Sequence, residues 1–195
     1  MHVTDLHRRS VDGFVTRVAA LDGLGPEAWG SPTPCGEWDV RALLNHLVSE
    51  DLWTVPLMEG ATIDEVGDRF EGDLLGDDPV GTARAAGEVA VTATASGIVA
   101  GRTVHLSFGD VSAEEYAYQL AADHIIHGWD LAAATGGDTS MEPDMVAALA
   151  EWFAANEDAY RQAGAIADRP AGDEAGDAWA DLLRAFGRDP GWTPG

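Results

Sequence analysis

Apolar residues recur at three- and four-residue steps along much of the chain, a spacing that predicts amphipathic α-helices. Val11, Phe14, Val15 and Val18 show this pattern in the first segment. The same periodicity recurs in two later segments, and residues 78–96 form an alanine-rich stretch that begins with Asp78-Pro79. We therefore predict four long helices, over residues 4–23, 39–54, 78–96 and 112–134.

Residues typical of helix starts and stops lie at the expected boundaries. Suitable N-caps occupy all four predicted starts, and they are Thr4, Asp39, Asp78 followed by Pro79, and Ser112. Ser112 with Glu115 forms a capping-box pattern, and Gly136 is a typical helix stop. Pro56 is expected to close the second helix.

The remaining segments predict smaller elements. Residues 59–77 are acidic and glycine-rich and indicate a lid-like loop, whereas residues 103–108 alternate with period two and indicate a short extended element. A fifth helix is expected to begin at Glu142-Pro143, and after a loose segment over residues 164–176 a small helix carries Trp179 and Phe186. The chain is thus predicted to be all-α, a four-helix bundle with a short extended element before the fourth helix and a small C-terminal helix, in one domain over residues 1–195.

The charge of the chain excludes several kinds of partner. Asp and Glu number 34 against 11 basic residues, all of them Arg, which gives a net charge of −23. Such a field repels phosphate backbones and anionic lipids, so we expect no nucleic-acid and no membrane partner. The polar start has no signal-peptide pattern, no stretch reaches the roughly 18 apolar residues of a membrane span, and the single cysteine fits a reducing cytoplasm.

Polar residues interrupt the apolar face of the fourth predicted helix. At about 100° per residue, Asp123 and His127 fall in the stripe marked by Tyr116, Leu120 and Leu131. An ionised carboxylate and an imidazole are costly there unless they are paired or bound to a metal. Two donors one turn apart can serve one ion, and His46 on the second helix is the natural third ligand. This set suits Zn²⁺ and does not exclude Ni²⁺ or Fe²⁺.

Other interpretations of these residues stay open. Asp123 and His127 could simply hydrogen-bond each other beside the core. His124 could replace Asp123 as a ligand or lie at the rim of the pocket, to which Tyr116, Trp53 and Asp130 are further candidates. Asp130 could orient the imidazole of His127 from the outer shell or be an ordinary surface charge.

The remaining histidines and the cysteine are less informative. His2 and His7 lie near the terminus and are expected to be solvated, and His105 is expected to face solvent. Cys35 is interpreted as structural, because Glu37 and Asp39 argue against the electropositive niche that a reactive thiol needs. An Arg of the tail, Arg184 or Arg188, could clamp a carboxylate at the bundle opening. The phosphate-binding glycine motifs and G-x-S-x-G are absent from the sequence.

Four motifs in order give a family resemblance. They are TPCGEWDVRAL at 33–43 with His46, GDLLGDDP at 72–79, HGWDLA at 127–132 with Gly136, and GRDP at 187–190. Over nearly its whole length the chain resembles the actinobacterial DinB-like metal-binding proteins, which are related to the N-terminal domain of mycothiol-dependent maleylpyruvate isomerase. The resemblance implies a four-helix bundle that binds a divalent ion through His46, Asp123 and His127, with Asp123 standing where the isomerase has Glu.

The resemblance also implies a chemistry. The isomerase looks like a two-domain protein, and this chain is expected to be too short for the second domain, so isomerisation of maleylpyruvate itself is not expected. What the family implies instead is an S-transferase or isomerase in which a metal-bound thiolate, with mycothiol as cosubstrate, attacks a small electrophile. A metal-dependent hydrolase and a non-catalytic metal-binding or stress-response module are the alternatives. The seven Trp residues are compatible with a homodimer formed through an exposed helix face.

Overall fold

The computed structural model describes residues 1–36, 38–171 and 176–194. Glu37 of the first motif and residues 172–175 of the predicted loose segment therefore lie outside the described residues. Within the described part, the predicted all-α class is confirmed: long helices dominate and the one sheet is a small two-stranded hairpin.

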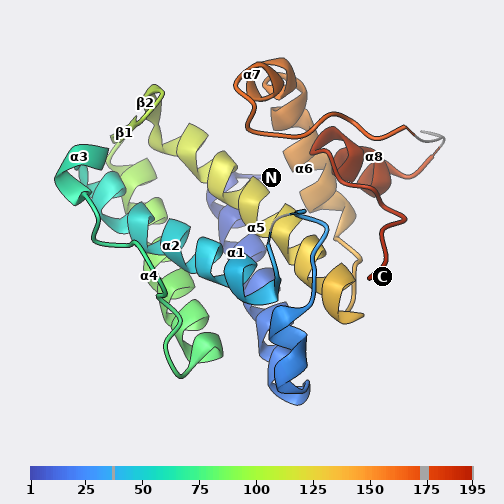
Figure 1. Cartoon of the computed structure of the whole chain (residues 1–195). Coiled ribbons are helices and arrows are strands. Elements are labelled where there is room, and N and C mark those ends of the chain that lie inside the picture. Colours follow the sequence, from blue (N-terminus) through green and yellow to red (C-terminus); the bar gives the residue numbers. More distant parts are fainter. Residues whose placement is uncertain (37, 172–175, 195) are drawn as a thin grey trace.

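Four long helices form the bundle, and they are α1 (Val3–Ala19), α2 (Val40–Glu59), α4 (Pro79–Val99) and α5 (Ala113–Thr135). α1 lies against α4 and α5, and α2 also packs against α4 and α5, so each helix has two main neighbours (Figure 1). Val18, Leu44 and Leu131, from α1, α2 and α5, are fully buried where these helices meet. The bundle thereby carries α2 and α5 side by side, which positions the polar residues discussed below.

Several predicted boundaries shift in the structure. The N-cap of α1 is His2 rather than Thr4, because the Thr4 backbone N–H donates to His2 Nδ1 at 3.3 Å. α2 continues through Pro56 and ends at Glu59, with Gly60 as its C-cap, so the prediction that Pro56 closes it is wrong. Proline costs the helix one backbone hydrogen bond. Leu57 and Met58 directly after it are buried, and their packing keeps the last turn in place.

The connections contain more structure than the pattern predicted. The short helix α3 (Ile63–Val66), with a complete Thr62/Glu65 capping box, lies within the segment expected to be a loop. The predicted extended element is one arm of a hairpin, β1 (Thr103–Leu106) paired antiparallel with β2 (Gly109–Ser112). Its tight turn is possible because Gly109 adopts φ +135°, which side chains disfavour. The hairpin then leads directly into α5 through the Ser112 N-cap.

The C-terminal third packs on the side of α5 that faces away from α2 and α4. It contains α6 (Pro143–Ala154), α7 (Glu157–Gln162), which the pattern did not predict, and α8 (Ala178–Ala185) (Figure 1). Ile125 and Trp129 of α5, with Phe153 of α6, belong to the hydrophobic cluster that joins this layer to the bundle. α5 is therefore covered on two sides, which explains why a polar residue along it is rarely exposed. None of the helices in the described part of the chain has both the length and the apolar character needed to cross a bilayer.

Candidate metal centre and pocket

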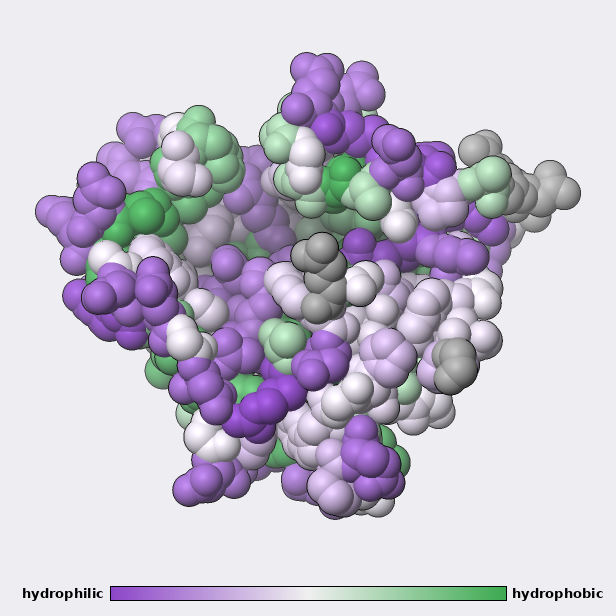
Figure 2. All heavy atoms as spheres, viewed as in Figure 1, coloured by the Kyte–Doolittle hydropathy of each residue, from purple (hydrophilic) through white to green (hydrophobic). Residues whose placement is uncertain are grey.

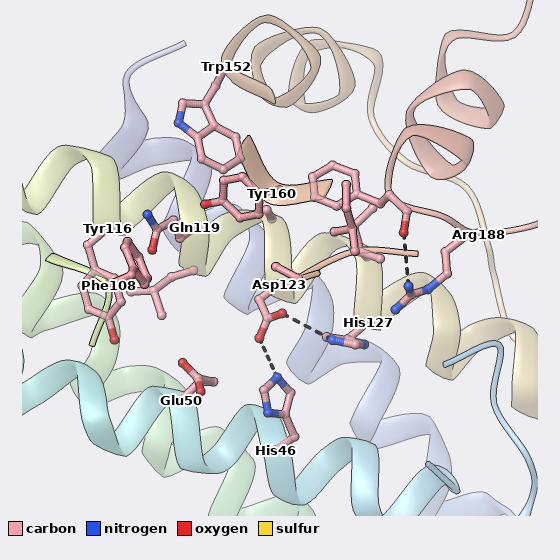
Figure 3. A pocket seen from close by; sticks show the side chains of 16 residues that line it. His46, Glu50, Phe108, Tyr116, Gln119, Asp123, His127, Trp152, Tyr160 and Arg188 are labelled. Atoms are coloured by element: carbon pink, nitrogen blue, oxygen red, sulfur yellow. Dashed lines mark hydrogen bonds and ion pairs between the residues drawn. The ribbon is translucent and has the colours of Figure 1, made fainter. Parts of the chain in front are cut away.

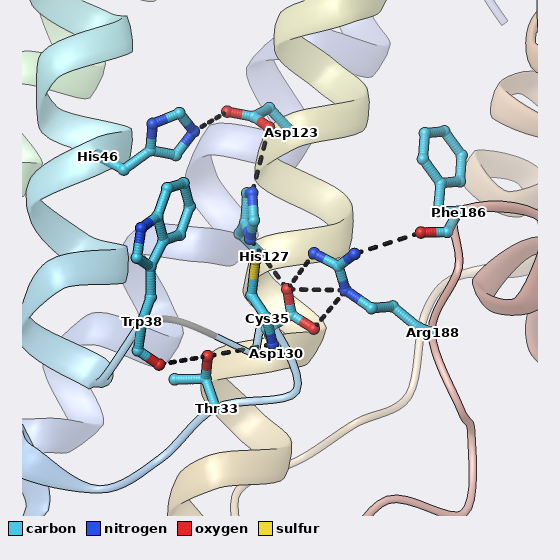
Figure 4. Close-up of polar contacts among 9 residues, drawn as sticks. All are labelled: Thr33, Cys35, Trp38, His46, Asp123, His127, Asp130, Phe186 and Arg188. Carbon is cyan, nitrogen blue, oxygen red and sulfur yellow. Dashed lines mark hydrogen bonds and ion pairs between the residues drawn. The ribbon is translucent and has the colours of Figure 1, made fainter. Parts of the chain in front are cut away.

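Three predicted ligands meet between α2 and α5. His46 Nε2 donates a hydrogen bond to Asp123 Oδ2 at 2.9 Å, and His127 Nε2 lies 3.3 Å from Asp123 Oδ1 (Figure 4). One donor atom from each of the three residues lies within 4.8 Å of the other two. Two imidazoles and a carboxylate at this spacing fit the ligand set of a divalent ion such as Zn²⁺ with further positions open. The donor set is therefore compatible with the predicted metal site.

The central carboxylate is strongly stabilised in its ionised form. Burial opposes ionisation, but His127 and His46 hold the pKa of Asp123 well below its usual range. Burial also disfavours the charged form of His127 and so lowers its pKa. The carboxylates of Asp123 and Asp130 outweigh this effect and raise the pKa of His127 to about 9. A metal ligand must be a neutral imidazole, so an ion binding here would displace a proton from His127.

Asp130 is hydrogen-bonded to the imidazole of His127, the contact that the outer-shell interpretation of this residue requires. His127 Nδ1 donates to Asp130 Oδ2 at 2.9 Å, which leaves Nε2 directed at Asp123. Arg188 in turn donates to both oxygens of Asp130, from Nε to Oδ1 at 2.9 Å and from Nη2 to Oδ2 at 2.8 Å. The predicted arginine clamp therefore exists, but the carboxylate that it holds belongs to the protein.

The loop before α2 covers one side of the site. Thr33 ties this loop closed by donating from Oγ1 to the Trp38 carbonyl at 2.8 Å. The Trp38 ring lies 4.5 Å from the His46 ring and 5.5 Å from the His127 ring, measured between centroids (Figure 4). Trp38 was not among the predicted site residues. The signal that could have indicated it is its place in the TPCGEWDVRAL motif, one residue before the N-cap Asp39.

Cys35 lies on the same loop and offers a second combination of donors with His127 and Asp130. Arg188 already neutralises Asp130, which disfavours a cation at that position. Burial raises the pKa of the Cys35 thiol, although Arg188 opposes this effect. Both observations favour the structural interpretation of Cys35 and leave His46, Asp123 and His127 as the better candidate site.

A pocket of about 320 Å³ opens next to these ligands (Figure 3). His46, Asp123 and His127 lie on its wall together with Tyr116, one of the predicted pocket residues. The opposite wall comes from the C-terminal third, through Trp152 and Tyr160. The candidate metal-binding side chains and an aromatic wall thus face one another across a small cavity, an arrangement typical of sites for small molecules.

Glu50 is a further polar residue of this pocket, one turn after His46 on α2. Burial, and next the negative charge of Asp123, raise its pKa to about 7. A carboxyl group with such a pKa can take up or release a proton near neutral pH. Glu50 was not among the predicted site residues, because its nearness to Asp123 becomes visible only in the structure.

Three predicted pocket residues lie elsewhere. The described residues that line the pocket do not include Asp130, Trp53 or His124. The Trp53 ring packs instead against Phe70, with centroids 5.9 Å apart. His124 is buried on the bundle side of α5, because one residue along a helix turns the side chain by about 100° away from Asp123. Its Nδ1 donates to the Leu120 carbonyl at 2.8 Å, so it neither forms the rim nor replaces Asp123.

His124 belongs to a separate buried polar cluster. His124 Nε2 lies 3.3 Å from Asp51 Oδ1, and the His7 ring lies edge-on to the His124 ring at 6.0 Å. The expectation that His7 is solvated is wrong, because its place on α1 turns it into the bundle, where 1% of it is exposed. Burial, followed by the nearby His124, lowers the pKa of His7 to about 3. His105 lies in the hairpin, where its side chain is partly exposed. His2 is the N-cap of α1.

Comparison with known protein families now adds to this geometry. Residues 11–132 match the family described as the mycothiol maleylpyruvate isomerase N-terminal domain. The chain belongs to this family. His46, Asp123, His127 and Asp130 all lie within the matched residues, whereas Trp152, Tyr160 and Arg188 lie beyond them.

Similar proteins occur in Mycobacterium tuberculosis. The uncharacterized protein Rv0738 of strain H37Rv and the uncharacterized protein MT0763 of strain CDC 1551 are each 30% identical to this chain over 145 residues. These alignments cover 71% of this chain and 70% of each relative. No solved structure matches this chain significantly. The family membership therefore supports a mycothiol-related, DinB-like metal-binding protein and leaves the reaction to be argued from the site.

Proposed function

We propose that the protein is a metal-dependent enzyme that joins a low-molecular-weight thiol, in the first place mycothiol, to a small electrophile, as an S-transferase or a thiol-dependent isomerase. The observation that supports this proposal is the convergence of His46, Asp123 and His127 at the wall of a small-molecule pocket. Zn²⁺ is the ion that the ligand set suits best, and Ni²⁺ or Fe²⁺ would also fit. We further propose that residues 1–195 act as one domain.

A divalent ion, when bound by these three residues, would lower the pKa of a coordinated thiol and so supply a thiolate nucleophile at neutral pH. The chain's own groups have complementary tasks. Asp130 fixes the ring of His127, and the Trp38 ring covers the two histidines against solvent. Glu50, whose pKa is about 7, is the group suited to receive the proton of the incoming thiol.

The test combines metal analysis with thiol binding. The protein is purified without an affinity tag, its metal content is determined, and a cobalt-substituted sample is titrated with mycothiol while the absorption spectrum is recorded. We expect one equivalent of metal and a sulfur-to-cobalt charge-transfer band that grows with the thiol. Metal without this band would overturn the thiol proposal, and a protein that binds no metal would overturn the metal site itself.

Hydrolysis is the second candidate, favoured specifically by Glu50. A carboxyl group with a pKa of about 7 beside open coordination positions is also suited to accept a proton from water. Turnover of an ester substrate that is independent of thiol would favour hydrolysis. Full metal occupancy with neither activity would favour the non-catalytic module. In either case we expect a reducing cytoplasm as the location, since a free thiol such as Cys35 persists there.

A further inference from the structure

The pocket beside the candidate metal centre has two chemically different sides. His46, Glu50 and Asp123 lie together at one side, whereas Tyr160 and Trp152 lie across from them (Figure 3). The polar side is the one that the proposed function uses for the ion and the thiol. The aromatic side is left for the second reactant, so its chemistry indicates what that reactant is.

The pocket offers no free positive charge to an anionic reactant. Among the described residues that line it, Arg188 is the one cationic side chain apart from the histidines, and both its Nε and Nη2 donate to Asp130. Its Nη1 donates to the Phe186 carbonyl at 3.2 Å. The charges of a divalent ion would be balanced by Asp123 and the thiolate of the proposed function. With a net charge of −23 on the whole chain, a carboxylate ligand would be repelled.

The aromatic side is held in place by ring contacts and by a hydrogen bond. The Trp152 ring stacks on the Tyr118 ring with an interplanar angle of 4° and centroids 5.5 Å apart. Trp152 Nε1 donates to Glu115 Oε2 at 2.9 Å, and the Tyr160 ring meets the Trp152 ring edge-on at 5.9 Å. Burial, and next the charge of Glu115, raise the pKa of Tyr160 to about 12, so this phenol stays uncharged. A fixed aromatic wall favours a flat partner, because little side-chain freedom is lost on binding.

A second aromatic group stands exposed at the mouth of the pocket. Phe108, in the turn of the hairpin between β1 and β2, lines the pocket yet is 73% exposed. In Figure 2, hydrophobic surface lies on both sides of the recess between the hairpin and α7. An exposed phenyl ring gains about 1.5–3 kcal/mol when it is fully covered by an apolar surface. An apolar ligand in the recess would cover it.

We propose that this pocket binds uncharged aromatic molecules of about one ring, between Phe108 and the wall formed by Trp152 and Tyr160. The volume of about 320 Å³ is at the low end for small-molecule sites and suits a ligand of this size. The inference rests on the proposed function, in which the bound aromatic molecule would be the electrophile. The binding itself can be measured without any reaction.

The test compares two aromatic probes of similar size and different charge. Isothermal titration calorimetry of the full chain, after metal has been removed with a chelator so that neither probe can coordinate an ion, gives the affinities for 4-nitrobenzyl alcohol and 4-nitrobenzoate. We expect the alcohol to bind about tenfold or more tightly than the anion. Phe108→Ala is expected to weaken the binding of the alcohol about tenfold. Val99→Ala is the matched control, since Val99 is 89% exposed and is not among the pocket residues, and it should leave the affinity unchanged.

Each other outcome overturns the inference. Equal or tighter binding of 4-nitrobenzoate would show that the pocket accepts anions, and absence of binding by both probes would exclude an aromatic site. Unchanged affinity in Phe108→Ala would place the probe elsewhere. Metal content and the thiol-dependent cobalt band are measured on the same preparation, so a failure of the proposed function is seen separately from a failure of the substrate class.

Discussion

Arg188 binds the buried carboxylate of Asp130 across 58 residues of sequence, with both oxygens engaged. Asp130 is fully buried, and the Arg188 side chain is 13% exposed. The same carboxylate accepts a hydrogen bond from His127 Nδ1, so the C-terminal tail is connected to the candidate ligand through a single intervening residue. The tail thus supports the site as well as the packing of α5.

Asp130→Asn is expected to weaken metal binding by about 10–100-fold while leaving the helices intact. The reason is that the amide carries no negative charge, so it neither raises the basicity of the His127 imidazole nor fixes its tautomer as firmly. The dissociation constant is measured by competition with a chelating dye. Asp144→Asn, at the exposed Arg9–Asp144 pair, is the control and should keep the affinity of the parent protein. An unchanged affinity in Asp130→Asn would refute the orienting role.

Arg188→Met is expected to lower the free energy of unfolding by about 3–5 kcal/mol, because it leaves the Asp130 carboxylate buried with reduced compensation. The double variant Asp130→Asn/Arg188→Met should be more stable than Arg188→Met alone. Urea unfolding of metal-free protein measures both. Arg9→Met removes a cation from a surface pair and should cost at most about 1 kcal/mol. If Arg188→Met and Arg9→Met lowered the free energy of unfolding by similar amounts, the burial of the Arg188–Asp130 pair would not explain the effect.

Local pattern was sufficient to predict most of the scaffold. The four long helices follow from apolar periodicity and from caps such as Asp39, whose carboxylate accepts from the Ala42 backbone N–H at 2.8 Å. The trio of His46, Asp123 and His127 follows from two ligands spaced one turn apart on one helix, a histidine on the second helix, and the family resemblance. The spacing is a short-range regularity, and the structure brings the three together.

What the pattern missed depends on tertiary contacts. His7 lies four residues before Val11, on the apolar stripe of α1, but its contact with His124 depends on the packing of α1 against α5. The partner of Arg188 lies far away in sequence, and the second hairpin strand contains Gly109 and Asp110, which disfavour strands in isolation. Pairing with β1 overrides that preference. Contacts between segments that lie far apart in sequence were therefore harder to predict than the helices themselves.

His46→Ala and His127→Ala are each expected to abolish stoichiometric metal binding, since two remaining protein ligands hold an ion weakly. Circular dichroism should show a helical fold in both variants. His105→Ala serves as the control, because that histidine is bonded to Asp110 in the hairpin and is not among the candidate ligands. Full metal occupancy in His127→Ala, measured by elemental analysis, would contradict the assignment.

Gly87→Ala is expected to destabilise the bundle, although alanine is the better helix former by about 1 kcal/mol. A Cβ at position 87 of α4 would lie 2.6 Å from Cγ1 of Val11, a buried residue of α1, so the two helices would have to separate. The melting temperature measures the effect. Gly13→Ala provides the comparison, since the nearest atom to its Cβ is the end of the Arg17 side chain at 3.4 Å, and it should melt at or above the parent temperature. Equal changes in the two variants would exclude close helix contact as the cause.

His7 is expected to make the protein acid-sensitive. Its folded-state pKa of about 3 is below the ordinary value of 6.5, so the unfolded chain binds a proton in this interval and the folded chain does not. The contribution of His7 is therefore present above about pH 6.5 and is lost as the pH falls, by up to about 1.4 kcal/mol per pH unit. Urea unfolding at pH 6.5 and 4.5 should show a drop for the parent protein that is about 2 kcal/mol smaller in His7→Leu. His2→Gln, at an exposed histidine, should follow the parent, and an equally steep loss in His7→Leu would assign the acid sensitivity to other groups.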